Sequence, residues 1–313
     1  MNRRDFIRQA GLGTAALSTL AALPAAASGN AAPHRLTILH TNDMHSRIEP
    51  FPDSAAQWAG LGGMARRATM IQQIRAQEPN VLLLDSGDIF QGTPYFNFFG
   101  GELEYKLMSQ MGYDASTLGN HDFDNGLDGL LRQLPHAKFP FLIANYDFSQ
   151  TELAGRFQPW KVFSKAGLRV GVFGLGIELK GLVADKNFGT TQYLDPAAKA
   201  REMVTQLRGP EKCDFVICLS HLGYKYSNVA DAEKIDDRKL AAQVAGIDLI
   251  LGGHTHTFMD APEAIISPDG HKTLINQVGW SGINLGRLDF EFVRGGRRSG
   301  LVQAVVLPVI GAC

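Results

Sequence analysis

The sequence lacks several features that would place it in a functional class at once. It has only 3 cysteines in 313 residues and no Cys-x-x-Cys pair, so it supports neither a zinc site built from thiolates nor a redox dithiol. Its 30 Lys and Arg residues nearly balance 31 Asp and Glu residues, so no overall positive field attracts a nucleic-acid polymer. The patterns G-x-x-x-x-G-K-[ST] and G-x-S-x-G are both absent. A P-loop nucleotide site and a serine nucleophile of the G-x-S-x-G type are therefore excluded.

A disulfide between Cys213 and Cys218 is not expected either. The two residues lie five positions apart in a strand-like run, so they should point to opposite faces and lie about 16 Å apart at the rise of a strand. That separation exceeds the distance that a disulfide spans. The third cysteine, Cys313, ends the chain, and the sequence indicates no partner for it.

The first 27 residues are typical of an export signal. Arg3 and Arg4 precede an uncharged stretch over residues 11–23, and Ala25–Ala27 has the small residues of a cleavage site. The arginine pair resembles the twin-arginine signal of bacterial export. The apolar stretch is shorter than the roughly 20 residues that span a membrane. We therefore expect residues 1–27 to be removed, no stable membrane anchor, and a periplasmic or otherwise exported protein.

Residues 28–313 alternate between short apolar runs and helical patterns, with no internal repeat or low-complexity linker. The apolar runs are typical of buried strands, and the longer amphipathic stretches, several closed by glycine, are typical of helices. This alternation predicts a single α/β domain with a β-rich C-terminal part. The expected strands are Leu36–His40, Val81–Asp85, Asp114–Leu118, Phe141–Ala144, Val170–Gly174, Phe215–Ser220, Asp248–Leu251, Thr273–Val278, Leu288–Val293 and Val302–Leu307, and the expected helices are Met64–Gln77, Glu102–Met111, Leu127–Leu134, Pro196–Arg208 and Arg238–Val244.

Polar side chains directly follow five of the expected strands. Because ligands bind open α/β sheets at the carboxyl ends of the strands, we expect these side chains to come together. Each short motif is weak alone, but five motifs that each follow an expected strand form a strong set. Five of the 9 histidines belong to it, while His34, His40, His136 and His271 are expected to be ordinary core or surface residues. The set contains Asp43, His45, Asp88, Asn120, His121, Asp122, Asp124, His221, His254 and His256.

This mixture of imidazole and carboxylate groups favours borderline divalent ions such as Zn, Mn, Fe or Co. Seven of these ten residues are candidate ligands, which is more than one tetrahedral ion needs. Two ions bridged by a carboxylate and a hydroxide would use all seven. Two such ions with Asp43, Asp88 and the hydroxide would leave a net charge of about +1, which attracts a phosphate group. The pattern therefore predicts a two-metal site that binds a small phosphorylated substrate.

The motifs resemble those of the calcineurin-like metallophosphoesterase superfamily. They are Asp43-x-His45, Gly87-Asp88, Gly119-Asn120-His121-Asp122, His221 and Gly253-His254-x-His256, in the order of that family. Within it, the runs His40–Asp43, Gly119–Asp124 and Asp248–His254 look like the 5′-nucleotidase and UDP-sugar hydrolase family. The resemblance covers roughly Leu36 to Leu307. It implies a four-layer α/β/β/α sandwich with two mixed sheets flanked by helices.

The resemblance also implies a role for each residue. Asp43, His45 and His256 would hold one metal ion, while Asn120, His221 and His254 hold the other and Asp88 bridges them. His121 would act on the reacting phosphate, oriented by Asp124. The implied reaction is in-line attack by a metal-bridging hydroxide on phosphorus, with no covalent phospho-enzyme. For Asp122 we expect an ordinary loop carboxylate.

The resemblance leaves the substrate open. Two-domain members carry a further C-terminal domain that binds the nucleoside, and because the resemblance extends only to about Leu307, we do not expect this domain in the chain. We therefore expect a 5′-nucleotidase-like phosphomonoesterase that either receives this domain from a separate polypeptide or takes less selective esters. The alternatives are a 2′,3′-cyclic nucleotide phosphodiesterase, a UDP-sugar hydrolase, a thiosulfohydrolase-like enzyme and a non-catalytic metal-binding subunit. Aromatic residues in Phe90–Phe99 and Arg47–Gly60 are candidates to stack a base or meet a partner, although packing is the expected role for most of them.

Overall fold

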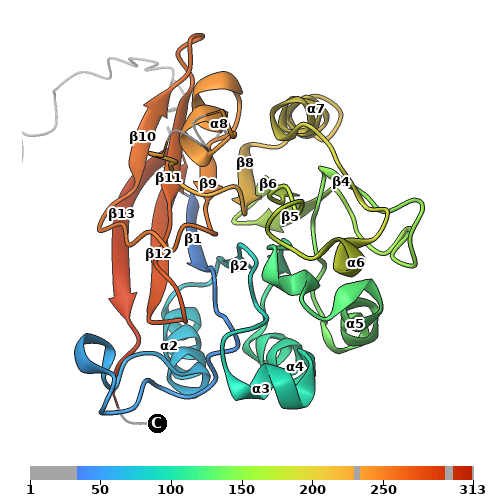
Figure 1. Ribbon diagram of the computed structural model, residues 1–313. Helices are drawn as coiled ribbons and strands as arrows, with labels where there is room; N and C mark the ends of the chain where they lie inside the picture. The colour runs from blue at the N-terminus through green and yellow to red at the C-terminus, as the bar shows by residue number, and fades with distance from the viewer. Residues whose placement is uncertain (1–33, 229–232, 293–298, 312–313) are drawn as a thin grey trace, which may run out of the picture. The chain divides into compact units, whose positions relative to one another are not determined.

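The computed structural model describes residues 34–228, 233–292 and 299–311 (Figure 1). The predicted export signal over residues 1–27 and the residue Cys313 lie outside these ranges. No helix in the described ranges combines the length and the apolar character needed to cross a bilayer.

One mixed sheet has five strands in the order β13-β12-β1-β2-β3. β1, β2 and β3 run parallel, while β12 pairs antiparallel with both β1 and β13. The parallel strands therefore deliver their carboxyl ends to a common edge. The strands are β1 (His34–Thr41), β2 (Val81–Asp85), β3 (Ala115–Ser116), β12 (Asn284–Phe292) and β13 (Ser299–Pro308).

A second mixed sheet has six strands in the order β10-β11-β9-β8-β6-β5. Its four inner strands are parallel, and β5 and β10 are antiparallel edge strands. A small two-stranded sheet, β4 with β7, lies apart from it in the pairing scheme. The strands are β4 (Tyr146–Asp147), β5 (Trp160–Lys165), β6 (Leu168–Leu175), β7 (Gln192–Tyr193), β8 (Phe215–Ser220), β9 (Leu249–Leu251), β10 (Glu263–Ile266) and β11 (Lys272–Asn276).

The helices begin and end at residues that favour those positions. Pro94 and Pro196 occupy the first turn of their helices, and the Asp195 carboxylate accepts a hydrogen bond from the backbone N–H of Ala198. Gly112 ends another helix in the left-handed conformation. The helices are α2 (Met64–Gln77), α3 (Pro94–Phe99), α4 (Glu102–Met111), α5 (Gly126–Gln133), α6 (Asp185–Phe188), α7 (Pro196–Arg208) and α8 (Asp237–Gln243), with short 3₁₀ turns at Ala56–Trp58, His121–Phe123 and Leu134–His136.

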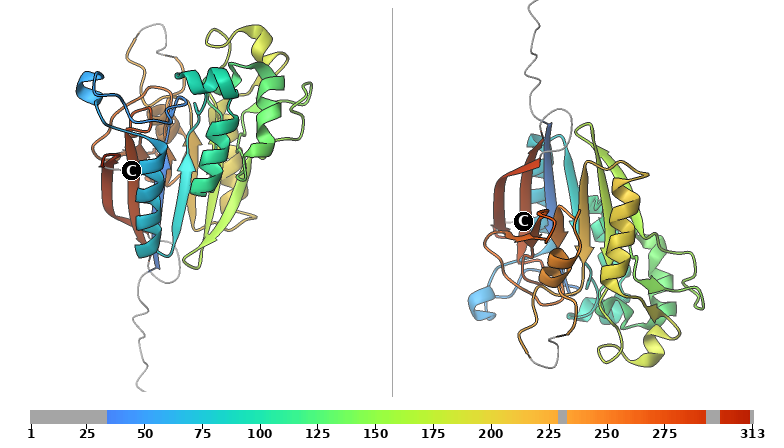
Figure 2. Two further views of the ribbon diagram at one scale, coloured as in Figure 1. Left: turned by 90° about the horizontal axis from the view of Figure 1, so that it is seen from below. Right: turned by 90° about the horizontal axis from the view of Figure 1, so that it is seen from above.

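Alternate residues of the central strands point into different layers of the core. In β2, Leu82 and Leu84 face the second sheet, whereas Val81 and Leu83 pack with residues of α2 and α4. In β8 the same alternation sends Val216 toward α7 and α8. Figure 2 shows α2 and α4 over one outer face and α7 over the opposite one. The predicted four-layer arrangement of two mixed sheets between helices is confirmed.

Some expected elements differ from the observed ones. The expected strand Phe141–Ala144 is wrong, because this buried segment forms only isolated bridges, from Phe141 to Ser116 and from Leu142 to Gln158. Strand β5 was not expected, because its edge position mixes apolar side chains with Lys161 and Ser164. Cys213 and Cys218 are free, as expected, and both are buried. The expectation that they point to opposite faces is wrong, because β8 begins only at residue 215 and both side chains join the same core cluster.

Candidate metal centre and active site

The polar side chains predicted from the motifs converge at the carboxyl ends of β1, β2, β8 and β9. Asp43 and His45 follow β1, Asp88 follows β2, and His221 follows β8. Two groups have ligand atoms within 4.8 Å of one another. Each group takes residues from both sheets: cluster 1 consists of Asp43, His45 and His256, and cluster 2 consists of Asp88, His221 and His254.

Cluster 1 has the geometry of a cation site. The Nε2 atoms of His45 and His256 lie 2.9 Å apart, and His256 Nε2 lies 3.4 Å from Asp43 Oδ1. The Nδ1 atom of His45 lies 3.3 Å from the Phe90 carbonyl oxygen, so this nitrogen carries the proton and Nε2 keeps its lone pair. Two imidazole nitrogens and a carboxylate oxygen this close together fit a divalent ion.

Cluster 2 consists of two buried residues and one half-buried residue, as cluster 1 does. His221 Nδ1 lies 2.6 Å from the Ser86 carbonyl oxygen, and its Nε2 lies 3.0 Å from Asp88 Oδ2. That Nε2 atom nevertheless makes no hydrogen bond of acceptable angle with any described residue. Asn120 joins the cluster, because its Oδ1 atom lies 2.9 Å from His254 Nδ1. An unsatisfied buried nitrogen beside a carboxylate is the position that a metal ion would satisfy.

Asp88 lies between the two clusters. Its Oδ2 atom is 3.0 Å from His221 Nε2 in cluster 2 and 3.9 Å from His45 Nε2 in cluster 1. Asp43 also approaches cluster 2, since its Oδ1 atom is 3.9 Å from His221 Nε2. The donor set of both clusters, imidazole and carboxylate with one amide oxygen, therefore fits a pair of divalent ions.

The backbone at these residues is strained. Positive φ angles are uncommon for residues other than glycine and cost on the order of 1–3 kcal/mol each. Such strain persists only where the surrounding structure imposes it. Here it occurs at most of the residues whose side chains form the two clusters. Six residues of the site have it: Asp43 (49°), His45 (47°), Ser46 (55°), Asp88 (55°), His254 (69°) and His256 (50°).

Asp122 organises the loop that carries Asp88. Its buried carboxylate accepts hydrogen bonds from the backbone N–H groups of Gly119, Asp88, Ile89 and Phe90. Gly119 is required beside it, because a Cβ atom there would collide with Asp88 Oδ1. Asp122 is a loop carboxylate, as expected, but no sequence motif indicated that it joins two of the loops that carry candidate ligands.

His121 lies outside both clusters. Its Nδ1 atom is 2.9 Å from Asp124 Oδ2, and this hydrogen bond raises the pKa of His121. The imidazole ring is 5.3 Å from that of His45, measured between centroids. Since Asp124 holds Nδ1, the Nε2 atom of His121 is left to act on a substrate.

Burial and charge act in opposite directions on the cluster histidines. Burial lowers the pKa of His254 to about 4 and also lowers that of His45, so both rings are neutral at pH 7, as metal ligands must be. For His221, burial would lower the pKa, but Asp88 outweighs it and raises the value to about 10. Binding of a cation at cluster 2 therefore competes with a proton on His221.

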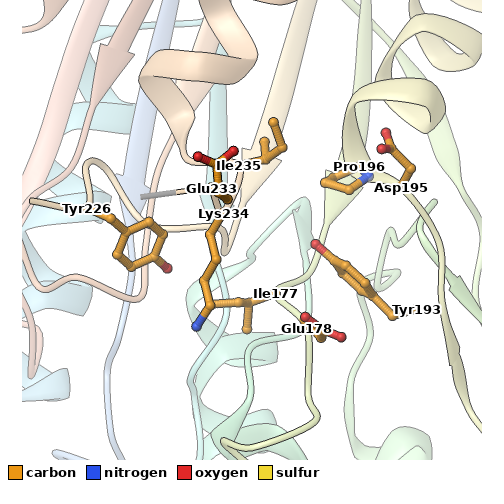
Figure 3. Close-up of a pocket in the computed structure, with 9 residues that line it drawn as sticks. All are labelled: Ile177, Glu178, Tyr193, Asp195, Pro196, Tyr226, Glu233, Lys234 and Ile235. Atoms are coloured by element: carbon orange, nitrogen blue, oxygen red, sulfur yellow. The ribbon is translucent and has the colours of Figure 1, made fainter. Parts of the chain in front are cut away.

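A cavity of about 220 Å³ opens beside cluster 1, and we call it the site cavity. A second pocket, of about 350 Å³, lies beyond cluster 2, where the Tyr226 ring is 6.4 Å from that of His254. Figure 3 shows Tyr226 and Tyr193 on opposite sides of this second pocket. The site cavity is lined by His45, Arg47, Gln91, Gly92, His121, His256, Trp280 and Ser281.

The aromatic candidates divide between core and surface. Phe90, Phe96 and Phe51 are buried, whereas Phe98 is 83% exposed and Phe99 is 47% exposed. Two residues of the site cavity, Arg47 and Trp280, had no assigned role in the sequence. Only the position of Arg47, two residues after His45, could have drawn attention to it.

A family model described as calcineurin-like phosphoesterase matches residues 36–258. The chain belongs to the calcineurin-like phosphoesterase family. The resemblance drawn from its motifs is thereby confirmed.

Relatives within this family include several 5′-nucleotidases. The rat 5′-nucleotidase is 36% identical over 82% of this chain and 46% of its own length, and that of Vibrio parahaemolyticus is 35% identical over 99% of this chain and 57% of its own. The crystal structure of the 5′-nucleotidase precursor from Thermus thermophilus superimposes with a TM-score of 0.75 at 32% identity, over 88% of this chain and 54% of the other. This phosphoesterase chain thus spans about half the length of these relatives.

Proposed function

We propose that this chain is a metal-dependent phosphomonoesterase that releases phosphate from nucleotides. The observation that carries the proposal is the pair of clusters with Asp88 between them, and with His121 beside them but in neither. Two adjacent divalent sites with an independent imidazole suit hydrolysis of a phosphate ester. The 5′-nucleotidase relatives support a nucleotide as the substrate.

In this proposal the two clusters bind the metal ions, and His121, oriented by Asp124, transfers a proton. Divalent ions held by the two clusters would supply Lewis acidity toward phosphoryl oxygens and a water-derived nucleophile at neutral pH. Zn, Mn, Fe and Co all suit the donor set, and we propose a pair drawn from these. His121 Nε2 would then donate a proton to the leaving oxygen, while Asp124 fixes the ring and stabilises its charged form.

A substrate panel tests this function. Nucleoside monophosphates, 2′,3′-cyclic nucleotides, UDP-glucose, thiosulfate-bearing esters and p-nitrophenyl phosphate would each be assayed with Mn or Zn, and again after chelation. We expect phosphate release from the nucleoside monophosphates that chelation abolishes and metal restores. Turnover of a different ester class alone would identify one of the alternatives, and no turnover with bound metal would indicate a non-catalytic subunit.

The location and the partner belong to the same proposal. We infer that residues 1–27 direct twin-arginine export to the periplasm, which a fusion to a reporter that is active only after export would test. We also propose that a nucleoside-binding domain in a separate polypeptide completes the recognition of the base. Its presence should lower KM for nucleotides while leaving that for p-nitrophenyl phosphate unchanged.

A further inference from the structure

One positively charged side chain that lines the site cavity, that of Arg47, has no role in the function described so far. Arg47 lines this cavity together with His45, His121 and His256. Among the described residues, none accepts a hydrogen bond from its guanidinium or forms an ion pair with it, and its Nε atom is buried without a partner. By contrast, Arg287 pairs with Asp289 and Glu78. A half-buried guanidinium loses part of its hydration, and here no anion within the described fold compensates for that loss.

Aromatic contacts hold Arg47 at this cavity. Its Cζ atom lies 4.2 Å from the centroid of the Phe51 ring. Phe51 meets Trp280 edge to face at 5.8 Å, and Trp280 stacks on His256 at 5.8 Å with an interplanar angle of 7°. Ring contacts through Phe51 and Trp280 therefore connect the guanidinium to His256 of cluster 1.

We propose that Arg47 binds the phosphoryl group of the substrate, across the site cavity from cluster 1. This inference rests on the proposed phosphoesterase function and adds a specific contact to it. A guanidinium offers a planar pair of N–H donors that matches two phosphoryl oxygens, and such charge-assisted bonds are stronger than neutral ones. Because the same cavity contains His121 and two ligands of cluster 1, the anion that reaches Arg47 is the phosphoryl group being transferred.

This placement predicts how the loss of Arg47 would change the hydrolysis of different esters. A contact with the transferred phosphoryl group is made by every monoester, whatever its leaving group. Loss of Arg47 should therefore affect a nucleoside monophosphate and p-nitrophenyl phosphate to the same extent. A contact with a second phosphate or with the base would instead affect only the substrates that carry that group.

The experiment uses the variants Arg47→Met and Arg47→Lys in the metal-loaded protein. Methionine keeps an unbranched apolar chain on Phe51, and lysine keeps the charge but loses the paired donors. The matched control is Arg132→Met, since Arg132 is 68% exposed at its side chain and pairs with Asp128 on α5. Affinity for inorganic phosphate is measured by isothermal titration calorimetry, kcat/KM is measured on AMP and p-nitrophenyl phosphate, and bound metal is counted by elemental analysis.

For Arg47→Met we expect about 10- to 100-fold weaker phosphate binding and a similar loss of kcat/KM on both esters, with the metal content unchanged. Arg47→Lys should recover part of each loss, and Arg132→Met should match the parent protein. Unchanged phosphate affinity in Arg47→Met, loss of metal, or a loss confined to one ester would overturn the proposal. If the parent hydrolyses no ester, the proposed function fails, while the phosphate titration still decides the role of Arg47.

Discussion

His121 differs from the metal-ligand candidates in what its side chain touches. It contacts Asp124 through Nδ1 and is 36% exposed at its side chain, whereas the cluster histidines contact one another or the carboxylates of the clusters. We predict that His121→Ala lowers kcat by roughly 10²- to 10⁴-fold, the usual contribution of a general acid. Steady-state kinetics and elemental analysis on one preparation check this together. Both ions should stay bound, and loss of metal with the activity would make His121 a ligand.

His40 gives a pH dependence that is separate from catalysis. This ring is fully buried in β1 beside Asn276, and burial lowers its pKa to about 3. The unfolded chain binds a proton at His40 below about pH 6.5, whereas the folded protein binds it only near pH 3. Stability is therefore fully present above pH 6.5 and falls as the pH decreases toward 3, by about 1.4 kcal/mol for each pH unit from this group.

Urea unfolding of the parent and of His40→Gln between pH 7.5 and pH 5 (a range of about 2.5 units) measures this contribution. The slopes of unfolding free energy against pH are compared, so a lower absolute stability of the variant does not matter. We expect the parent to lose more stability on acidification than the variant. Parallel slopes would mean that His40 carries a proton in the folded protein well above pH 3.

At the scale of elements, one carboxylate joins two of the loops that carry ligands. Asp122 accepts hydrogen bonds from four backbone N–H groups, three of them in the loop after β2. We predict that Asp122→Ala costs about 2–4 kcal/mol of unfolding free energy, because it leaves buried donors unpaired, and that it weakens metal binding. The control is Asp128→Ala on α5, whose side chain is 66% exposed and which should cost under about 0.5 kcal/mol. Equal stability of the two variants would contradict this role.

The elements that the sequence predicted well are those with unbroken periodicity. Met64–Gln77, Glu102–Met111 and Pro196–Arg208 have the expected bounds, because each has a helical pattern and a defined stop. Phe141–Ala144 is apolar, but it pairs with its neighbours only at isolated bridges. An apolar run does not show whether its neighbours will form a continuous ladder with it. The edge strand β5 was missed because a half-exposed strand lacks a clear apolar run.

The site could be predicted as a set of residues but not as a geometry. Strand ends followed by Asp, Asn and His predicted the residues that form both clusters. Asp122 bonds to the loop after β2 across 32 to 34 positions of sequence, and Trp280 stacks on His256 across 24 positions. The unpaired guanidinium of Arg47 likewise depends on which residues the fold places around it. Such contacts depend on which loops the fold brings side by side, so no local pattern contains them.

At the scale of the whole molecule, the two clusters cross-link the two sheets. Asp43, His45 and Asp88 follow strands of the five-stranded sheet, whereas His221, His254 and His256 follow strands of the six-stranded sheet. Ions bound between the sheets should stabilise the folded protein. An ion that binds only the folded state adds about 2.7 kcal/mol to the unfolding free energy at a hundredfold excess over its Kd. For a chain of this size, we predict that chelation lowers Tm by roughly 5–10 °C. Scanning calorimetry with and without chelator measures the shift, and Asp88→Ala should reduce it because one ligand of both ions is missing. A Tm that chelation leaves unchanged in the parent protein would contradict the link between the sheets.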